Sequence, residues 1–86
     1  MNIRIVYADP IRDLLGIEQE HLAVSAPVPT VQSVIYQLVA RGGRWADAFA
    51  HPGRTVLSAV NRQVVRRDHP LLPGDVLALF PPGAGA

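Results

Sequence analysis

The side chains that most often perform chemistry in proteins are few in this chain of 86 residues, and they share no recognisable spacing. There is no cysteine, which excludes a thiol nucleophile, a disulfide, and zinc or iron–sulfur sites with cysteine ligands. His21, His51 and His69 lack the spacing of metal ligands, and Ser58 has no histidine or aspartate at the spacing of a nucleophile's partners. We therefore predict neither catalytic side chains nor a metal site.

The end of the chain has a distinct composition, and it reads Phe80-Pro81-Pro82-Gly83-Ala84-Gly85-Ala86. Proline has no backbone N–H, so Pro81 and Pro82 end strand pairing and hold the chain in a stiff, extended exit. The four residues that follow are glycine and alanine, whose slim backbone fits a narrow channel, and they span at most about 14 Å. The composition predicts a flexible tail over residues 83–86.

The elements that must position this tail are predicted from the spacing of the apolar residues. Ile3, Ile5 and Tyr7 alternate with polar or smaller residues, which is the period of a strand. Thr30 is a predicted N-cap, and the apolar residues after it recur at helical spacing until the glycines at 42–43. The other predicted elements are a helical turn at 11–15, a strand within 17–25, a turn at 45–49, and strands at 55–60, 64–65 and 76–80.

This order of elements predicts an α+β fold in which one mixed sheet of about five strands wraps over one main helix, in a single domain over residues 1–82. In the last strand, alternation places Leu77 and Leu79 in the core and Phe80 on the outer face with Val64. The formal net charge of +1 gives no argument for nucleic acid. No apolar run approaches a membrane span or a signal peptide, so a cytoplasmic protein without membrane contact is expected.

Several short motifs together resemble a known family over nearly the whole chain. The most specific of these motifs is Phe80-Pro81-Pro82 followed by four final residues. The motifs together cover residues 7–8, 11–16, 29–31, 44–45, 59–61, 68–71, 73–75 and 80–82. On these residues the chain resembles the small subunits of molybdopterin synthase, which are ubiquitin-like sulfur carriers of the MoaD/ThiS family. The resemblance implies the β-grasp fold.

The resemblance also implies a function for the tail. In this family an ATP-dependent activating enzyme adenylates the terminal carboxylate, and sulfur then replaces AMP to give a thiocarboxylate. The thiocarboxylate donates sulfur in molybdenum cofactor biosynthesis, inside the active site of the large synthase subunit. The expected assembly is a heterotetramer with two large subunits in the centre and one small subunit at each end. The chain would be a non-catalytic subunit and sulfur-donor cosubstrate that binds no cofactor of its own.

The site residues implied by the resemblance fall into three groups. The thiocarboxylate and adenylation tail is Gly83, Ala84, Gly85 and Ala86; the tail exit is Pro81 and Pro82; and the partner-docking surface is Phe80, Val64 and Tyr7.

The last residue departs from the family, which ends in Gly-Gly. Ala86 stands where the terminal glycine belongs, and its methyl group next to the reacting carbon can clash with a tight site. Ala86 is an engineered change, a natural and tolerated variant, or the mark of a carrier that is inactive or is trimmed to Gly85. Two other functions stay open: a sulfur carrier for thiazole, a tungsten cofactor or an amino acid, and a β-grasp interaction or modifier domain without sulfur chemistry.

Overall fold

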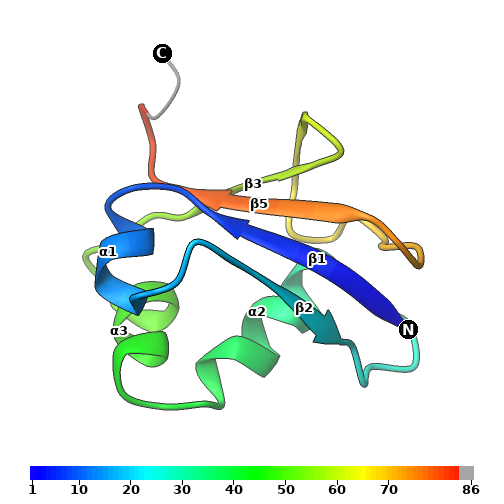
Figure 1. Cartoon of the computed structure of the whole chain (residues 1–86), viewed down its shortest axis with the longest axis horizontal. Helices are drawn as coiled ribbons and strands as arrows, with labels where there is room; N and C mark the ends of the chain where they lie inside the picture. Colours follow the sequence, from blue (N-terminus) through cyan, green and yellow to red (C-terminus); the bar gives the residue numbers. More distant parts are fainter. Residues whose placement is uncertain (84–86) are drawn as a thin grey trace.

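A computed structural model of the chain describes residues 1–83. It contains five strands and three helices in an order that matches the sequence prediction, with the two predicted turns formed as short helices (Figure 1). The elements are β1 (Asn2–Tyr7), α1 (Ile11–Leu15), β2 (Gln19–Ala23), α2 (Val31–Val39), α3 (Arg44–Ala50), β3 (Leu57–Val60), β4 (Gln63–Val65) and β5 (Val76–Phe80).

The five strands form one sheet in the order β2-β1-β5-β3-β4. The first and last strands of the chain, β1 and β5, are parallel neighbours in the middle of the sheet, and the other pairs are antiparallel. The three helices lie together on one side of the sheet, below it in Figure 1. This mixed sheet over one main helix is the ubiquitin-like β-grasp fold, and the predicted fold class is confirmed.

The core lies between the sheet and α2, and strand alternation decides which residues enter it. Ile5 on β1 and the Leu77 and Leu79 side chains on β5 have no exposed surface, as the period of two in both strands predicts. On α2 the buried residues follow the predicted helical spacing: Val31, Val34, Ile35 and Leu38. Burying these side chains is the main stabilising contribution of such a small domain.

The main helix begins at the predicted N-cap. Thr30 Oγ1 accepts a hydrogen bond from the Ser33 backbone N–H (3.2 Å), and Ser33 Oγ accepts one from the Thr30 N–H (2.8 Å). These reciprocal bonds form a capping box and satisfy two N–H groups that the helix leaves unpaired. Within residues 1–83 no helix has the length and apolar character needed to cross a bilayer.

Candidate functional site

The chain leaves the sheet where the sequence analysis placed the tail exit. β5 ends at Phe80, Pro81 is half-buried, and Pro82 and Gly83 are exposed. In Figure 1 this segment (red) rises from the end of β5, on the side of the sheet opposite the helices. The structure therefore places the root of the tail beside the outer face of the sheet. The other tail residues, Ala84, Gly85 and Ala86, lie outside the described residues.

The outer face of the sheet carries an apolar strip beside the tail exit. The strand registers align Val6, Ala78, Ala59 and Val64 in one row across β1, β5, β3 and β4. Val64 is 72% exposed, and Ala59 in the middle of the row is buried by its neighbours. We use the name "apolar strip" for this row together with the outward-facing Leu57, Val76 and Phe80.

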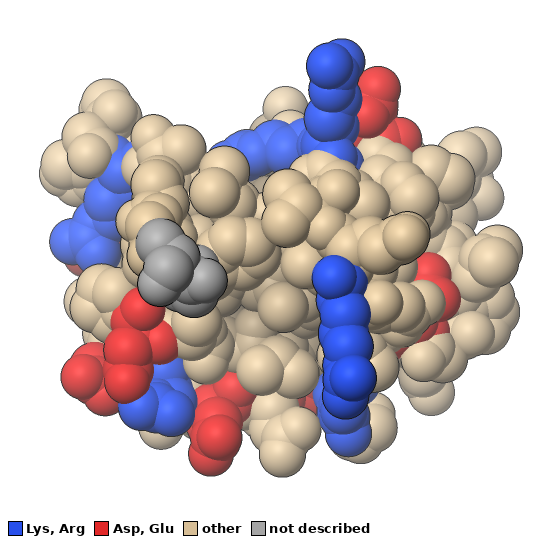
Figure 2. Space-filling model, turned by 90° about the horizontal axis from the view of Figure 1, so that it is seen from above, with Lys and Arg blue, Asp and Glu red and all other residues tan. Residues whose placement is uncertain are grey.

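The charges around the apolar strip are unevenly distributed. None of the outward-facing strand residues is Asp or Glu, whereas Arg4 faces outward on β1 with His21 opposite it on β2. Figure 2 looks onto this face, where uncharged surface (tan) fills most of the middle, arginines (blue) lie on opposite sides of it, and carboxylates (red) lie at the periphery. The outer face is therefore apolar and basic.

A surface depression lies at the end of the apolar strip away from the tail exit. It is lined by Arg4, Asn61, Arg62, Val76 and Ala78, so it joins β1, β5 and the β3–β4 turn. In Figure 1 the chain around this turn (yellow-green) rises above the sheet on the same side as the residues that follow β5. The outer face is therefore bounded at both ends, by the tail exit and by the turn.

Asn61 fixes the β3–β4 turn to the beginning of β5. Its Nδ2 donates to Asp75 Oδ1 (3.0 Å), and its Oδ1 accepts from the Val76 backbone N–H (3.1 Å). Asn61 and Arg62 both have positive φ, +49° and +74°, a conformation that suits asparagine and glycine at the two central positions of a tight hairpin turn. The turn is thus held by Asn61, while Arg62 occupies a position that favours glycine.

Tyr7 is not on the outer face, so its assignment to the docking surface is wrong. It is 1% exposed and shares the inward side of β1 with Ile3 and Ile5, because side chains alternate along a strand. Its ring lies against Trp45 and Phe49 on α3, with ring centroids 5.8 and 6.3 Å away. The outward position beside β5 belongs to Val6, the residue that alternation alone would have identified.

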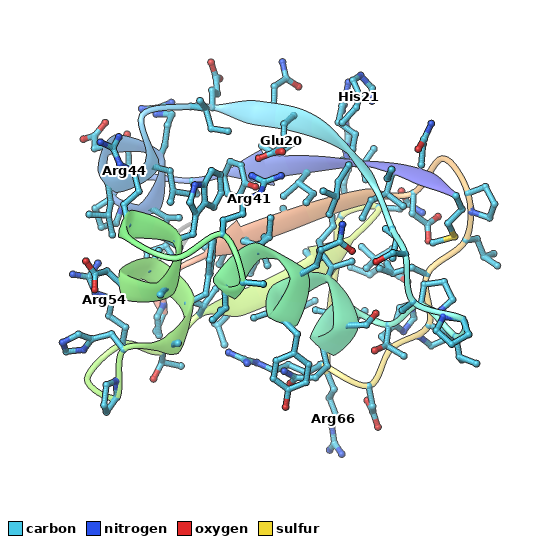
Figure 3. All side chains as sticks on the ribbon, turned by 90° about the horizontal axis from the view of Figure 1, so that it is seen from below. Glu20, His21, Arg41, Arg44, Arg54 and Arg66 are labelled. Atoms are coloured by element: carbon cyan, nitrogen blue, oxygen red, sulfur yellow. The ribbon has the colours of Figure 1, made fainter. Side chains whose placement is uncertain are left out.

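The Tyr7 hydroxyl instead belongs to a polar network on the inner side of the sheet. It donates to Glu20 Oε2 (2.8 Å), and the Arg41 guanidinium donates to both Glu20 oxygens (3.0 and 2.7 Å). Figure 3, seen from the helix side, shows Glu20 and Arg41 pointing toward each other between β2 and the helices. The network joins β1, β2 and the chain after α2.

The network shifts the proton affinities of its members. Hydrogen bonds from Arg41 hold the pKa of the Glu20 carboxyl below its ordinary value, and the bond from Tyr7 acts in the same direction. Burial, and then the bond to Glu20, raise the pKa of the Tyr7 hydroxyl far above its ordinary value. At neutral pH the carboxylate is therefore charged and the hydroxyl remains a donor, as expected for a structural network.

Phe80 and Val64 face outward together, as the sequence analysis predicted from strand alternation. Their role in docking stays a prediction. The docking residues predicted from the sequence did not include the arginines at the end of the strip or its other members, Val6, Leu57, Ala59, Val76 and Ala78. Within residues 1–83 none of the three histidines lies in a cluster of three or more side chains that could hold a metal ion. The described site is therefore an apolar, basic face of the sheet with the root of the tail beside it.

Comparison with known proteins identifies the family of this chain. The family model described as "ThiS family" matches residues 5–85. The molybdopterin synthase sulfur carrier subunit of Escherichia coli (strain K12) is 37% identical over 83 residues, which cover 96% of this chain and 98% of that protein.

Two solved structures have the same fold at low sequence identity. The small archaeal modifier protein 1 of Haloferax volcanii superposes with a TM-score of 0.76 and 19% identity, covering 94% of this chain and 97% of the other. A chain from the complex of subunits 1 and 2 of the molybdopterin-converting factor of Helicobacter pylori superposes with a TM-score of 0.66 and 21% identity, covering 100% of both chains. Because the family model and the Escherichia coli relative both match almost the whole domain, the chain belongs to the ThiS family, as its resemblance to the molybdopterin synthase small subunits indicated.

Proposed function

We propose that this chain is the sulfur-carrier small subunit of a molybdopterin synthase. The observation that carries the proposal is the 37% identity, over almost the full length of both chains, to a protein named as the sulfur carrier subunit of that enzyme. The working group is the C-terminal carboxylate, and the product of loading is a thiocarboxylate that donates sulfur in molybdenum cofactor biosynthesis.

Loading needs two steps because a free carboxylate is a poor electrophile. In the first step, a carboxylate oxygen attacks the α-phosphorus of ATP and pyrophosphate leaves, which gives an acyl adenylate. In the second step, hydrosulfide supplied by a donor attacks the acyl carbon, AMP leaves, and loss of one proton gives the thiocarboxylate. Both steps take place in a separate activating enzyme, which binds the ATP. This division of labour agrees with the sequence, which contains no cysteine and no lysine.

The described surface supports a carrier that works by inserting its tail into another protein. The apolar strip offers Val64 and Phe80 for docking, and the chain leaves the sheet directly after Phe80, two strands away from Val64. The chain turns at Pro82 and Gly83, where Gly83 has a φ of +84°, so the exit is not the straight extension that the two prolines predicted. Pro81 and Pro82 still have a fixed φ, which limits the conformational entropy lost when the tail enters a channel. We propose that the large synthase subunit docks on the apolar strip and takes up the tail, in the heterotetramer expected for the family.

Intact-mass spectrometry after incubation with an activating enzyme, ATP and a sulfur donor tests the proposal. Three chains are compared: the chain as given, Ala86→Gly, and Ala84→Gly as a matched change at a position that does not carry the reacting carboxylate. The expected result is a mass gain equal to the replacement of one oxygen by one sulfur, present with ATP and absent without it. Ala86→Gly should load faster, and Ala84→Gly should load like the parent chain.

The other outcomes of this experiment separate the remaining functions. A mass gain in Ala86→Gly alone would show a carrier inactivated at its last residue. No gain in any variant would contradict sulfur chemistry and favour a β-grasp interaction or modifier domain. A loaded chain that gives no molybdopterin with the large subunit and the pterin precursor would be a carrier for another pathway.

A further inference from the structure

Two arginines line one depression of the outer face without a counterion from the described part of the chain. Arg4 comes from β1 and Arg62 from the β3–β4 turn, and the lining between them is completed by Asn61, Val76 and Ala78. Within residues 1–83, neither guanidinium forms an ion pair or a side-chain hydrogen bond. Two like charges that share a depression repel each other, so an anionic partner would stabilise both.

Two other arginines are neutralised within the domain. Arg12 pairs with Asp9, and Arg41 pairs with Glu20. Arg44, Arg54, Arg66 and Arg67 form no ion pair within residues 1–83 either, so what distinguishes Arg4 and Arg62 is that both line one depression. The carboxylate close to the depression belongs to Asp75, and its oxygens already accept hydrogen bonds from Asn61 Nδ2 (3.0 Å) and the Leu72 N–H (2.8 Å). Asp75 reduces the local positive potential, but its hydrogen bonds are used to hold the turn and the beginning of β5.

The backbone at Arg62 is a second, independent observation. Its φ of +74° lies in the left-handed region, where a side chain costs about 1 kcal/mol and glycine costs nothing of this kind. Asn61 already supplies the hydrogen bonds that hold the turn, and the Arg62 side chain makes none within residues 1–83. Folding alone would therefore favour glycine at position 62, and the arginine is better explained by a contact outside the chain.

We propose that the Arg4–Arg62 depression binds carboxylate side chains of the large synthase subunit and thereby orients that subunit on the apolar strip. This inference rests on the proposed function and adds to it the chemistry of the partner surface. An apolar area of the large subunit would cover Val64 and Phe80. An acidic segment of the same subunit would enter the depression, which lies at the opposite end of the apolar strip from the tail exit. The contact fixes which end of the sheet faces the channel.

Exposed charges at the rim of an interface act mainly on the association rate, because they attract the partner before contact and are screened by salt. The apolar strip, in contrast, acts mainly on dissociation. Removing one of the two arginines should therefore slow association at low ionic strength and leave dissociation nearly unchanged. The difference should fade as salt is added.

Stopped-flow association with the purified large subunit, over a series of salt concentrations, tests this inference. The variants are Arg4→Gln, Arg62→Gln and Arg62→Gly, and the control is Arg44→Gln, which removes an exposed arginine at the beginning of α3 on the helix side (Figure 3). At low salt each of the first three should associate roughly threefold more slowly, with a shallower salt dependence, and the control should match the parent chain. Arg62→Gly should also keep or raise the melting temperature, which separates its slower binding from any loss of folding.

The results that would overturn the inference differ from those that would overturn the proposed function. If the complex forms and Arg4→Gln and Arg62→Gln associate no more slowly than Arg44→Gln, the depression does not bind the large subunit. If these variants slow only the reaction with the activating enzyme, the assignment of the partner is wrong. If the parent chain forms no complex with the large subunit, both the proposed function and this inference fail.

Discussion

Replacing Tyr7 by phenylalanine tests whether this residue is part of the core or of the docking surface. The change removes a single atom, the hydroxyl oxygen that donates to Glu20 Oε2 at 2.8 Å. The phenyl ring still fills the same space between β1, Trp45 and Phe49. The variant therefore isolates one hydrogen bond in a residue that is 1% exposed.

The expected loss of unfolding free energy depends on the hydrogen bonds that Glu20 keeps in the variant. A hydrogen bond to a charged acceptor contributes about 1.5–3 kcal/mol, and Glu20 keeps both of its bonds to Arg41, so no buried charge is left unpaired. We therefore expect the low end of that range, about 1.5 kcal/mol of unfolding free energy. In a domain of this size this lowers the melting temperature by about 6–12 °C.

Thermal and denaturant unfolding at pH 7 measure this loss, and Tyr36→Phe is the matched control. Tyr36 lies on α2 and is 68% exposed, so the same chemical change there should alter stability by less than about 0.5 kcal/mol. The large-subunit affinity of Tyr7→Phe, measured well below its melting temperature, should equal that of the parent chain.

The pH dependence gives a second readout of the same bond. Glu20 has a folded-state pKa below its unfolded value, so its contribution is present above about pH 4 and is lost as the pH falls through the folded pKa. Tyr7 has a raised pKa, so its contribution is full below about pH 10 and declines in stronger alkali. The difference between parent and variant should therefore be constant near neutrality and shrink in acid.

Two results would refute this reasoning. If Tyr7→Phe lost no more stability than Tyr36→Phe, the hydroxyl would contribute nothing to the Glu20 network. If Tyr7→Phe weakened the complex while its stability stayed unchanged, Tyr7 would belong to the docking surface after all.

Three further substitutions test separate parts of the molecule. Leu79→Ala removes a fully buried side chain, so chemical denaturation should show a loss of about 2–5 kcal/mol, and a loss below 1 kcal/mol would contradict its place in the core. Thr30→Ala removes the acceptor for the Ser33 N–H and should cost about 1 kcal/mol in the same assay, whereas Thr30→Ser should cost little. Val64→Asp places a charge on a side chain that is 72% exposed, so the free energy of unfolding should change by less than about 0.5 kcal/mol. Calorimetry should show at least about tenfold weaker binding of the large subunit. Unchanged binding would show that Val64 is not part of the interface.

Much of the fold was predictable because its strands and main helix carry strong local patterns. Alternation in Ile3, Ile5 and Tyr7, and in Leu77 and Leu79, identifies both central strands and their buried sides. The error at Tyr7 arose when a family position was given more weight than that alternation. The segment from Arg44 to Ala50 was predicted only as a turn, because seven residues are too few to form a stable helix alone and depend on packing against the core.

The candidate site was predictable only in part, because it joins residues far apart in the chain. Phe80 and Val64 were placed on one face by alternation within each strand. The meeting of Arg4 with Arg62 depends on β5 lying between β1 and β3, and on the register that aligns Arg4 with Val76. No local pattern in a single sequence specifies such a register, so the basic end of the outer face appears only in the structure.

The central position of β5 also links translation to function. β5 is the last strand to leave the ribosome, and it alone connects the β1–β2 hairpin to the β3–β4 hairpin. An isolated hairpin is at most marginally stable in water, so a nascent or truncated chain that ends before Val76 should not fold. A molecule that displays the outer face has therefore been synthesised at least through Phe80, the last strand residue before the tail exit. Chains that end before β5, which could otherwise block the large subunit without carrying sulfur, are therefore excluded by the topology of the sheet.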